Sequence, residues 1–177
     1  KRDWSSDVCS SDLNDSILWL FSDEVLLIGC SDSVWIAKPS NNSAGLSNTD
    51  IGLKRQIAFG SEWVDPVYAD NSPFYLQRGK QKIRSINYTA NQSKFTTEDV
   101  TIRSDHITGS GIKRFDYQQN PISTIWALRE DGQIAKFVYE NNQDVNCWTR
   151  FKTNGLIEDI AIIPSGKEYD EIYFVVN

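Results

Sequence analysis

The chain has 177 residues and a net charge of −6, and this length is enough for one domain with a sizeable core. Its hydrophobic content of 40% and aromatic content of 12% predict a packed globular body rather than a disordered chain. The acidic balance, without any run of more than two basic residues, argues against nucleic-acid binding by counterion release. No apolar run approaches the ~20 residues of a membrane helix, so we expect no membrane segment.

The first residues of the chain are not expected to belong to a fold. The segment Asp3–Leu13, DWSSDVCSSDL, is identical over eleven residues to the in-frame translation of a common short-read sequencing adapter. Chance identity over that length is negligible, so we expect residues 1–13 to be an adapter-derived artefact. Residues 14–177 are then expected to be a fragment of a larger β-propeller-like domain. Cys30 and Cys147 remain, and their wide separation predicts neither a metal site nor a disulfide.

From Ile17 onward, short apolar runs alternate with turn residues, which predicts antiparallel β structure. The dipeptide Asp131-Gly132 suits the positive backbone angles of a tight hairpin turn, and Gly79-Lys80 predicts a second hairpin. Pro66 indicates an edge strand or a bulge, and the polar stretch Pro39–Asp50 indicates a loop. In chain order, the predicted strands are Ile17–Phe21, Val25–Gly29, Val34–Lys38, Arg55–Gly60, Trp63–Tyr68, Phe74–Arg78, Lys82–Tyr88, Thr124–Arg129, Gln133–Glu140, Asn146–Phe151, Leu156–Ile163 and Glu171–Val176.

One segment departs from the strand pattern. Thr97–Ile107 opens with a threonine suited to a helix N-cap, followed directly by two acidic residues. Val100, His106 and Ile107 then lie at near-helical spacing. The segment therefore predicts one short helix, and its β-branched content leaves an irregular loop as the alternative.

A weak repeat runs through the turns. Asp32-Ser33, Gly79-Lys80 and Asp131-Gly132 each precede a strand, Gly166-Lys167 is a candidate fourth, and the spacings are 47, 52 and 35 residues. Repeats of ~40–50 residues with about four strands are typical of propeller blades. We therefore predict a mainly β, antiparallel, partial β-propeller-like fold with about three to four blade-like units. A β-sandwich or a Greek-key barrel is the alternative, and both predict more even strand lengths.

No combination of residues predicts catalysis. His106 is the only histidine, and on a helix its neighbours Ser104 and Asp105 point in other directions, so they cannot form a triad with it. Residues 15–32 lack calcium-loop spacing, and the glycines of Gly109–Gly111 lack the lysine and helix of a phosphate loop. Carboxylates adjacent on a strand face opposite sides, so a pair cannot enter one cleft for glycoside hydrolysis. These pairs are Glu98-Asp99, Glu158-Asp159 and Asp170-Glu171.

We accordingly predict no catalytic, cofactor-binding or metal-binding residue and no cofactor. The tryptophans are the remaining candidates, because they could line a sugar-binding face. Trp126 and Trp148 lie inside apolar strands, where filling the space between sheets is the more common role. Trp63, beside Glu62 and Asp65, is the one expected to be exposed. The tryptophans considered are Trp19, Trp35, Trp63, Trp126 and Trp148.

The order of these segments resembles a family of large phage and prophage structural proteins encoded among head and tail genes. The resemblance covers Ile17–Val176, and the combination of FGSEWVDPV, QRGKQKIRS, YQQNP and DG before CWTR carries it most specifically. The sequence departs from the family pattern at Cys30, Phe59, Lys80, Ser85 and Thr149. The matching stretches are ILWLFSDEVLLIGCSDSVWIAKP, RQIAFGSEWVDPVYADNSPFYLQRGKQKIRSINY, FTTEDVTIRSDHI, GIKRFDYQQNPISTIWALREDGQIAKFVYENNQDVNCWTRF and EDIAIIPSGKEYDEIYFVV.

The resemblance implies a non-enzymatic tail component of the virion, similar to the β-propeller nozzle or hub proteins of short-tailed phages. Its partners would be other copies of itself and neighbouring tail proteins, after assembly in the bacterial cytoplasm. DNA would pass through an acidic channel without specific binding. The alternative is a carbohydrate-binding or carbohydrate-processing β-propeller of a phage adsorption apparatus, with exposed aromatics and separated carboxylates at one mouth. A cellular β-rich binding domain is a third hypothesis.

Overall fold

The structure is a computed structural model that describes residues 15–40, 45–47, 50–140, 143, 145–166 and 168–177. The adapter-like segment Asp3–Leu13 lies outside the described residues. So does part of the predicted loop Pro39–Asp50, whose described portion contains only an isolated bridge between Ser47 and Asp50.

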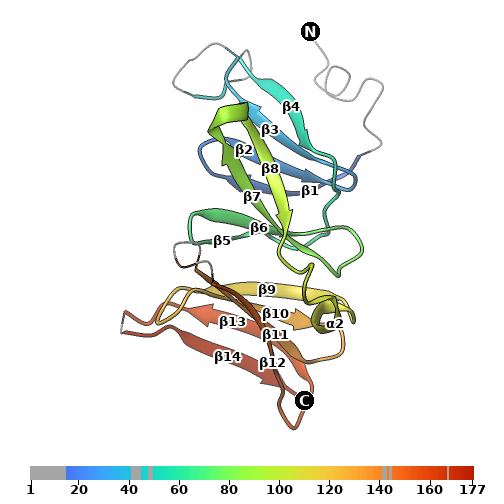
Figure 1. The fold of residues 1–177 in the computed structure, drawn as a ribbon, viewed down its shortest axis with the longest axis vertical. Coiled ribbons are helices and arrows are strands. Elements are labelled where there is room, and N and C mark those ends of the chain that lie inside the picture. Colours follow the sequence, from blue (N-terminus) through green and yellow to red (C-terminus); the bar gives the residue numbers. More distant parts are fainter. Residues whose placement is uncertain (1–14, 41–44, 48–49, 141–142, 144, 167) are drawn as a thin grey trace.

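The described strands form three four-stranded antiparallel sheets and one hairpin, each with its strands in chain order. Figure 1 shows that these units follow one another along the longest axis, from β1–β4 to β13–β14. This confirms the prediction of a mainly antiparallel β fold, while the described residues form neither a closed barrel nor a closed propeller. The strands are β1 (Ile17–Ser22), β2 (Leu26–Cys30), β3 (Val34–Lys38), β4 (Gly52–Ile57), β5 (Val67–Ala69), β6 (Ser72–Leu76), β7 (Ile83–Thr89), β8 (Lys94–Asp99), β9 (Ile112–Gln118), β10 (Thr124–Arg129), β11 (Ile134–Glu140), β12 (Val145–Phe151), β13 (Ile157–Ile163) and β14 (Glu171–Val176).

Alternate residues of the central strands enter two different hydrophobic cores. Along β6, Phe74 and Leu76 face the sheet β9–β12, whereas Tyr75 between them packs with the sheet β1–β4. Along β10, Ile125 packs toward the sheet β5–β8, and Trp126 packs toward the hairpin β13–β14. Because successive strand residues point to opposite faces, these strands are apolar at consecutive central positions and buried throughout.

The first strands of the four units lie in a row. Phe21 of β1 stacks on Tyr68 of β5, with ring centroids 6.1 Å apart, and β5 in turn contacts β9. The Asp116 carboxylate of β9 accepts a 2.9 Å hydrogen bond from the Ile162 amide of β13. The fourth strands β4 and β8 also meet, through a hydrogen bond from the Phe95 amide to Gln56. Consecutive units are therefore packed face to face with their first strands adjacent, and the first two units also share the same orientation.

The helix predicted over Thr97–Ile107 is wrong for its first half. Thr97 belongs to β8, where its hydroxyl donates to the Ser85 carbonyl of β7. Asp99 then receives hydrogen bonds from the amide and hydroxyl of Thr101, which turns the chain instead of starting a helix. The helix is confirmed only as the single turn α2 (Asp105–Thr108), and a 3-10 turn, η1 (Ala90–Gln92), precedes β8.

Two further strands differ from the prediction. The strand predicted over Trp63–Tyr68 begins only at Val67, because Pro66 has no amide donor and the Val64 amide bonds the Glu62 carbonyl in a tight turn. Strand β9 was not predicted at all. Its pairing with β10 shifts register near Ile112, so that its buried residues Ile112 and Phe115 lie three positions apart. The two-residue alternation that predicts a strand is therefore not visible in the sequence.

Truncating Phe74 tests whether stability depends on the packing between sheets. Its ring is fully buried and meets Phe137 and Tyr139 of the neighbouring sheet edge-on. Phe74→Ala should lower the free energy of unfolding by about 3–5 kcal/mol, measured by urea denaturation followed by circular dichroism. The control Tyr173→Ala removes an aromatic ring that is 53% exposed and should change stability by less than about 0.5 kcal/mol. Equal losses would contradict this account of the core.

Candidate interaction surfaces

The residues considered for catalysis are not brought together. His106 lies exposed on α2, and its carbonyl accepts a 2.6 Å hydrogen bond from Arg150. No hydrogen bond in the described part of the chain joins its imidazole to Ser104 or Asp105. Among the described residues, no group of three or more His, Cys, Asp or Glu could hold a metal ion.

The paired carboxylates mostly serve the fold. Asp99 binds Lys82 at 3.0 Å, and Asp159 binds Arg114 at 3.2 Å. Asp170 accepts the amides of Gln119 and Asn120, which ties the β13–β14 loop to the β9–β10 loop. The pairs therefore do not form the two-carboxylate cleft that glycoside hydrolysis requires.

The cysteines have different environments. Cys30 is buried, and this burial together with the nearby Asp15 charge raises the pKa of its thiol to about 11. Its thiolate is therefore scarce at neutral pH. Cys147 is exposed on β12, and the two remain unpaired.

The structure groups the predicted turns at one place in each sheet. Asp32-Ser33, Gly79-Lys80 and Asp131-Gly132 all join the second strand of a sheet to its third. Gly132 has the positive φ of 72° that a tight turn needs. Gly166 lies between the two strands β13 and β14 and also precedes a strand, while Lys167 is outside the described residues. Three of the predicted turns therefore occupy the same place in their sheets, and Gly166 lies in the turn of the hairpin.

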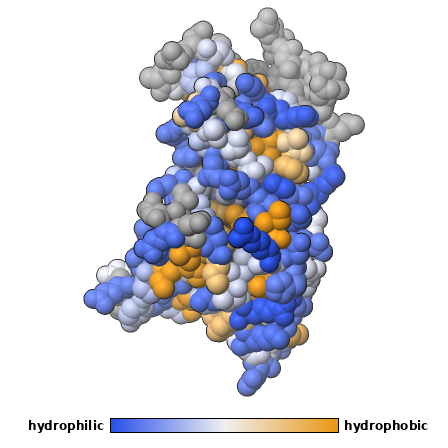
Figure 2. Space-filling view, in the orientation of Figure 1, coloured by the Kyte–Doolittle hydropathy of each residue, from blue (hydrophilic) through white to orange (hydrophobic). Residues whose placement is uncertain are grey.

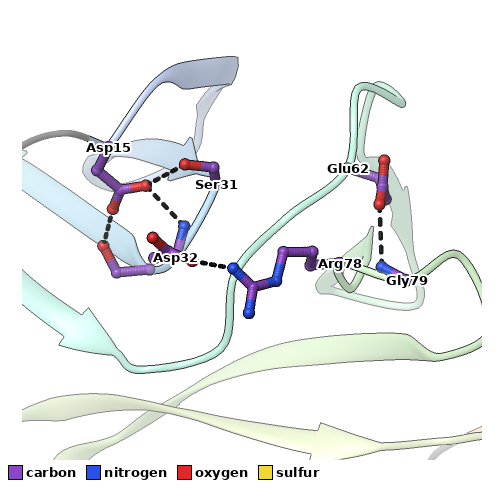
Figure 3. A network of polar contacts seen from close by, with 7 residues as sticks. Asp15, Ser31, Asp32, Glu62, Arg78 and Gly79 are labelled. Carbon is purple, nitrogen blue, oxygen red and sulfur yellow. Dashed lines mark hydrogen bonds and ion pairs between the residues drawn. The ribbon is translucent and has the colours of Figure 1, made fainter.

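The turn between β2 and β3 is held by the Asp15 carboxylate. One oxygen accepts from the Ser31 hydroxyl at 2.7 Å and from the Asp32 amide at 2.6 Å, and the other accepts from the Ser33 hydroxyl at 2.6 Å. Figure 3 shows this turn facing Arg78, which follows β6 and forms an ion pair with Asp32. The Asp32–Arg78 pair is largely exposed, so it contributes at most about 1 kcal/mol.

Backbone hydrogen bonds make the first junction between sheets, and Gly60 lies at its centre. The Ser61 amide donates to the Cys30 carbonyl at 2.8 Å, and the Gly60 carbonyl accepts from the Arg78 amide at 3.0 Å. A Cβ on Gly60 would lie 1.9 Å from the Ser31 carbonyl oxygen. No side chain larger than hydrogen fits there unless the backbones separate.

The same junction recurs between the next two units. The Ile112 amide donates to the Lys80 carbonyl at 2.7 Å, and the Gly111 carbonyl accepts from the Glu130 amide at 3.0 Å. Lys80 and Glu130 also form an ion pair at 2.9 Å. At the third junction the Ile157 amide donates to the Gly132 carbonyl at 2.9 Å. No sequence motif marks these positions, although Ser61 and Ile112 are 51 residues apart, close to the 52 residues between the second and third turns.

The hairpin β13–β14 has one buried face and one exposed apolar face. Ile160, Ile162, Ile172 and Phe174 pack against the sheet β9–β12. On the opposite face Ile163, Tyr173 and Val175 are 52%, 53% and 57% exposed. We call this side the outer face of the last hairpin, made of Ala161, Ile163, Tyr173 and Val175.

Trp63 is exposed, as the sequence predicts. Its side chain is 74% exposed and borders a cavity of about 490 Å³ formed by residues 63–67 and 113–116. Three other described tryptophans pack: Trp19 and Trp126 are buried, and Trp148 stacks on Phe137 at 4.6 Å. Figure 2 shows hydrophobic side chains in separate patches on a largely hydrophilic face, rather than in one broad groove.

Comparisons with known proteins give no family for this chain. Neither protein-family models nor curated protein sequences match it. Among the described residues, no helix has the length and apolarity to cross a membrane.

Replacing Gly60 by alanine tests the junction. Gly60→Ala should lower the free energy of unfolding by about 1–3 kcal/mol, because the added methyl overlaps the Ser31 carbonyl. Gly45→Ala is the matched control, since a Cβ there meets nothing within 4 Å. Thermal unfolding by calorimetry measures both, and an unchanged transition for Gly60→Ala would show that the sheets are not in such close contact.

Acid titration tests the Asp15 network. Partial burial opposes ionisation of Asp15, but the hydroxyls of Ser31 and Ser33, the Asp32 amide and the Arg55 charge together hold its pKa below the ordinary 3.8. A lowered folded-state pKa stabilises the fold above pH 3.8, and this contribution is lost as the pH falls through the folded-state value. Asp15→Asn should therefore be less stable at neutral pH and lose less stability on acidification, measured by urea midpoints from pH 7 to 2.5. Parallel curves would contradict this role.

Proposed function

We propose that this chain is a structural part of a phage tail, within a β-propeller-like ring that forms or closes the DNA channel. The observation that carries the proposal is the serial stacking of the units, with β1, β5, β9 and β13 in a row and a junction of the same kind at each step. In a propeller, repeated sheets packed in this way surround a central channel along their first strands.

The family resemblance supports the same proposal at particular residues. The segments that carry it include Gly60-Ser61, Arg78-Gly79 and Asp131-Gly132, whereas Lys80 departs from the family pattern. Within these segments Gly60, Ser61, Arg78 and Gly132 take part in the junctions between units. The resemblance therefore falls on the positions that determine how one sheet follows another, as expected for proteins built from the same stack.

The net charge of −6 suits a passage for DNA. An acidic wall repels the phosphate backbone, so DNA would move along it without being held. Partners would be other copies of this protein and adjacent tail proteins, and the location would be the virion.

The test is to recover the flanking coding sequence from the same DNA source. Genes for portal, head or tail proteins on either side would support the proposal. A neighbourhood of metabolic genes, or a secretion signal directly upstream, would overturn it in favour of a cellular binding domain.

Substitution on the outer face of the last hairpin tests whether the stack continues. We expect the purified chain to self-associate through this face, because exposed apolar strand faces are sites of association. Tyr173→Lys combined with Val175→Lys should shift the protein toward monomer in sedimentation velocity. Ile102→Lys, at a position that is 67% exposed on a loop, is the control and should leave association unchanged. A monomeric unsubstituted chain would contradict the prediction.

A carbohydrate-binding role in a phage adsorption apparatus is the second candidate. The exposed Trp63 ring beside its cavity favours it, because a water-exposed tryptophan next to a hollow is typical of ligand recognition.

A further inference from the structure

The Trp63 cavity lies where two units meet. Its walls are the segment leading into β5 and the first half of β9, so they come from neighbouring sheets. Its volume of about 490 Å³ is within the ~300–1,000 Å³ of small-molecule sites. Four charged residues border it, which makes it unsuited to a wholly apolar ligand: Asp65, Lys113, Arg114 and Asp116.

The backbone next to Trp63 is anchored although its ring is exposed. The Glu62 amide donates to the Leu76 carbonyl, and the Glu62 carboxylate accepts from the Gly79 amide at 2.9 Å. Trp35, Trp126 and Trp148 direct their indole N–H groups to protein oxygens. The Trp63 N–H makes no hydrogen bond in the described part of the chain, so both its ring face and its donor are available to a ligand.

The charged groups of the cavity differ in what they already bind. Lys113 donates to the Glu158 carbonyl, Arg114 pairs with Asp159, and Asp116 accepts from the amides of Tyr117 and Ile162. Asp65 makes no hydrogen bond or ion pair with any described residue. The cavity therefore combines a flat aromatic ring with one available carboxylate acceptor, and the remaining N–H groups of Lys113 and Arg114 can still donate.

We propose that Trp63 and Asp65 form a binding site for a neutral pyranose unit of an oligosaccharide. The apolar C–H face of the sugar stacks on the indole. Its hydroxyls donate to Asp65 and accept from the remaining N–H groups of Lys113 and Arg114. The Asp116 carboxylate already accepts two backbone amides, which leaves Asp65 as the available carboxylate, so we expect binding without hydrolysis. The proposal is independent of the assignment to a phage tail.

Binding is tested first with the whole chain on an array of bacterial O-antigen and capsular oligosaccharides that contain neutral hexoses. The best-binding glycan is then titrated into protein carrying 5-fluorotryptophan. The Trp63 fluorine resonance is identified as the one lost in Trp63→Phe. We expect this resonance to shift on titration, whereas those of the buried tryptophans remain in place.

Affinities of variants decide the outcome. Trp63→Ala should weaken binding at least about tenfold, and Asp65→Asn should weaken it several-fold. Ile102→Ala, which removes an exposed side chain outside the cavity, should leave affinity unchanged, and circular dichroism verifies that each variant is folded. Absence of binding to every glycan, or equal affinity of Trp63→Ala and Ile102→Ala, would overturn the proposal. Neither result would affect the gene-neighbourhood test of the tail assignment.

Discussion

The structure depends on burying both faces of its central sheets. A sheet with one apolar face needs one partner, but β6 and β10 are apolar on both faces and need two. The two central sheets are therefore stable only between neighbours, which makes the stack a consequence of their sequence. The backbone junctions at Gly60 and Gly111 then set how closely consecutive sheets approach. The exposed ion pairs beside them contribute far less energy than the buried aromatic side chains.

Strand positions could largely be predicted from the sequence, because apolar runs and turn residues are local signals. β3, β10 and β14 have the predicted limits. The prediction failed where a nonlocal partner decided the conformation. Thr97 is compatible with a helix cap, yet pairing with β7 makes it part of a strand. In β9 the register shift near Ile112 replaced alternation with a spacing of three, which no single-strand pattern reveals.

The candidate sites likewise include features that local sequence predicts and features that depend on distant residues. The exposure of Trp63 could be predicted from its acidic neighbours, because a charged setting on both sides does not fit a core position. Its cavity could not be predicted, since the opposite wall comes from β9, about 50 residues later. Likewise, Asp15 shows no motif, and its role appears only when the turn of Ser31 and Ser33 folds onto it. The adjacent carboxylates, in contrast, are solvated or stabilise the fold. This follows from strand geometry, because adjacent residues of a strand face opposite sides.

The two ion pairs at the junctions carry opposite polarity. In the first, the turn residue is acidic and its partner basic, Asp32 with Arg78; in the second, the turn residue is basic and its partner acidic, Lys80 with Glu130. If the sheet β9–β12 followed β1–β4 directly, Asp32 would meet Glu130, and two negative charges would face each other. Although each pair adds little stability, together they disfavour the wrong order of sheets. The charges therefore favour the correct order of otherwise similar units while the stack assembles.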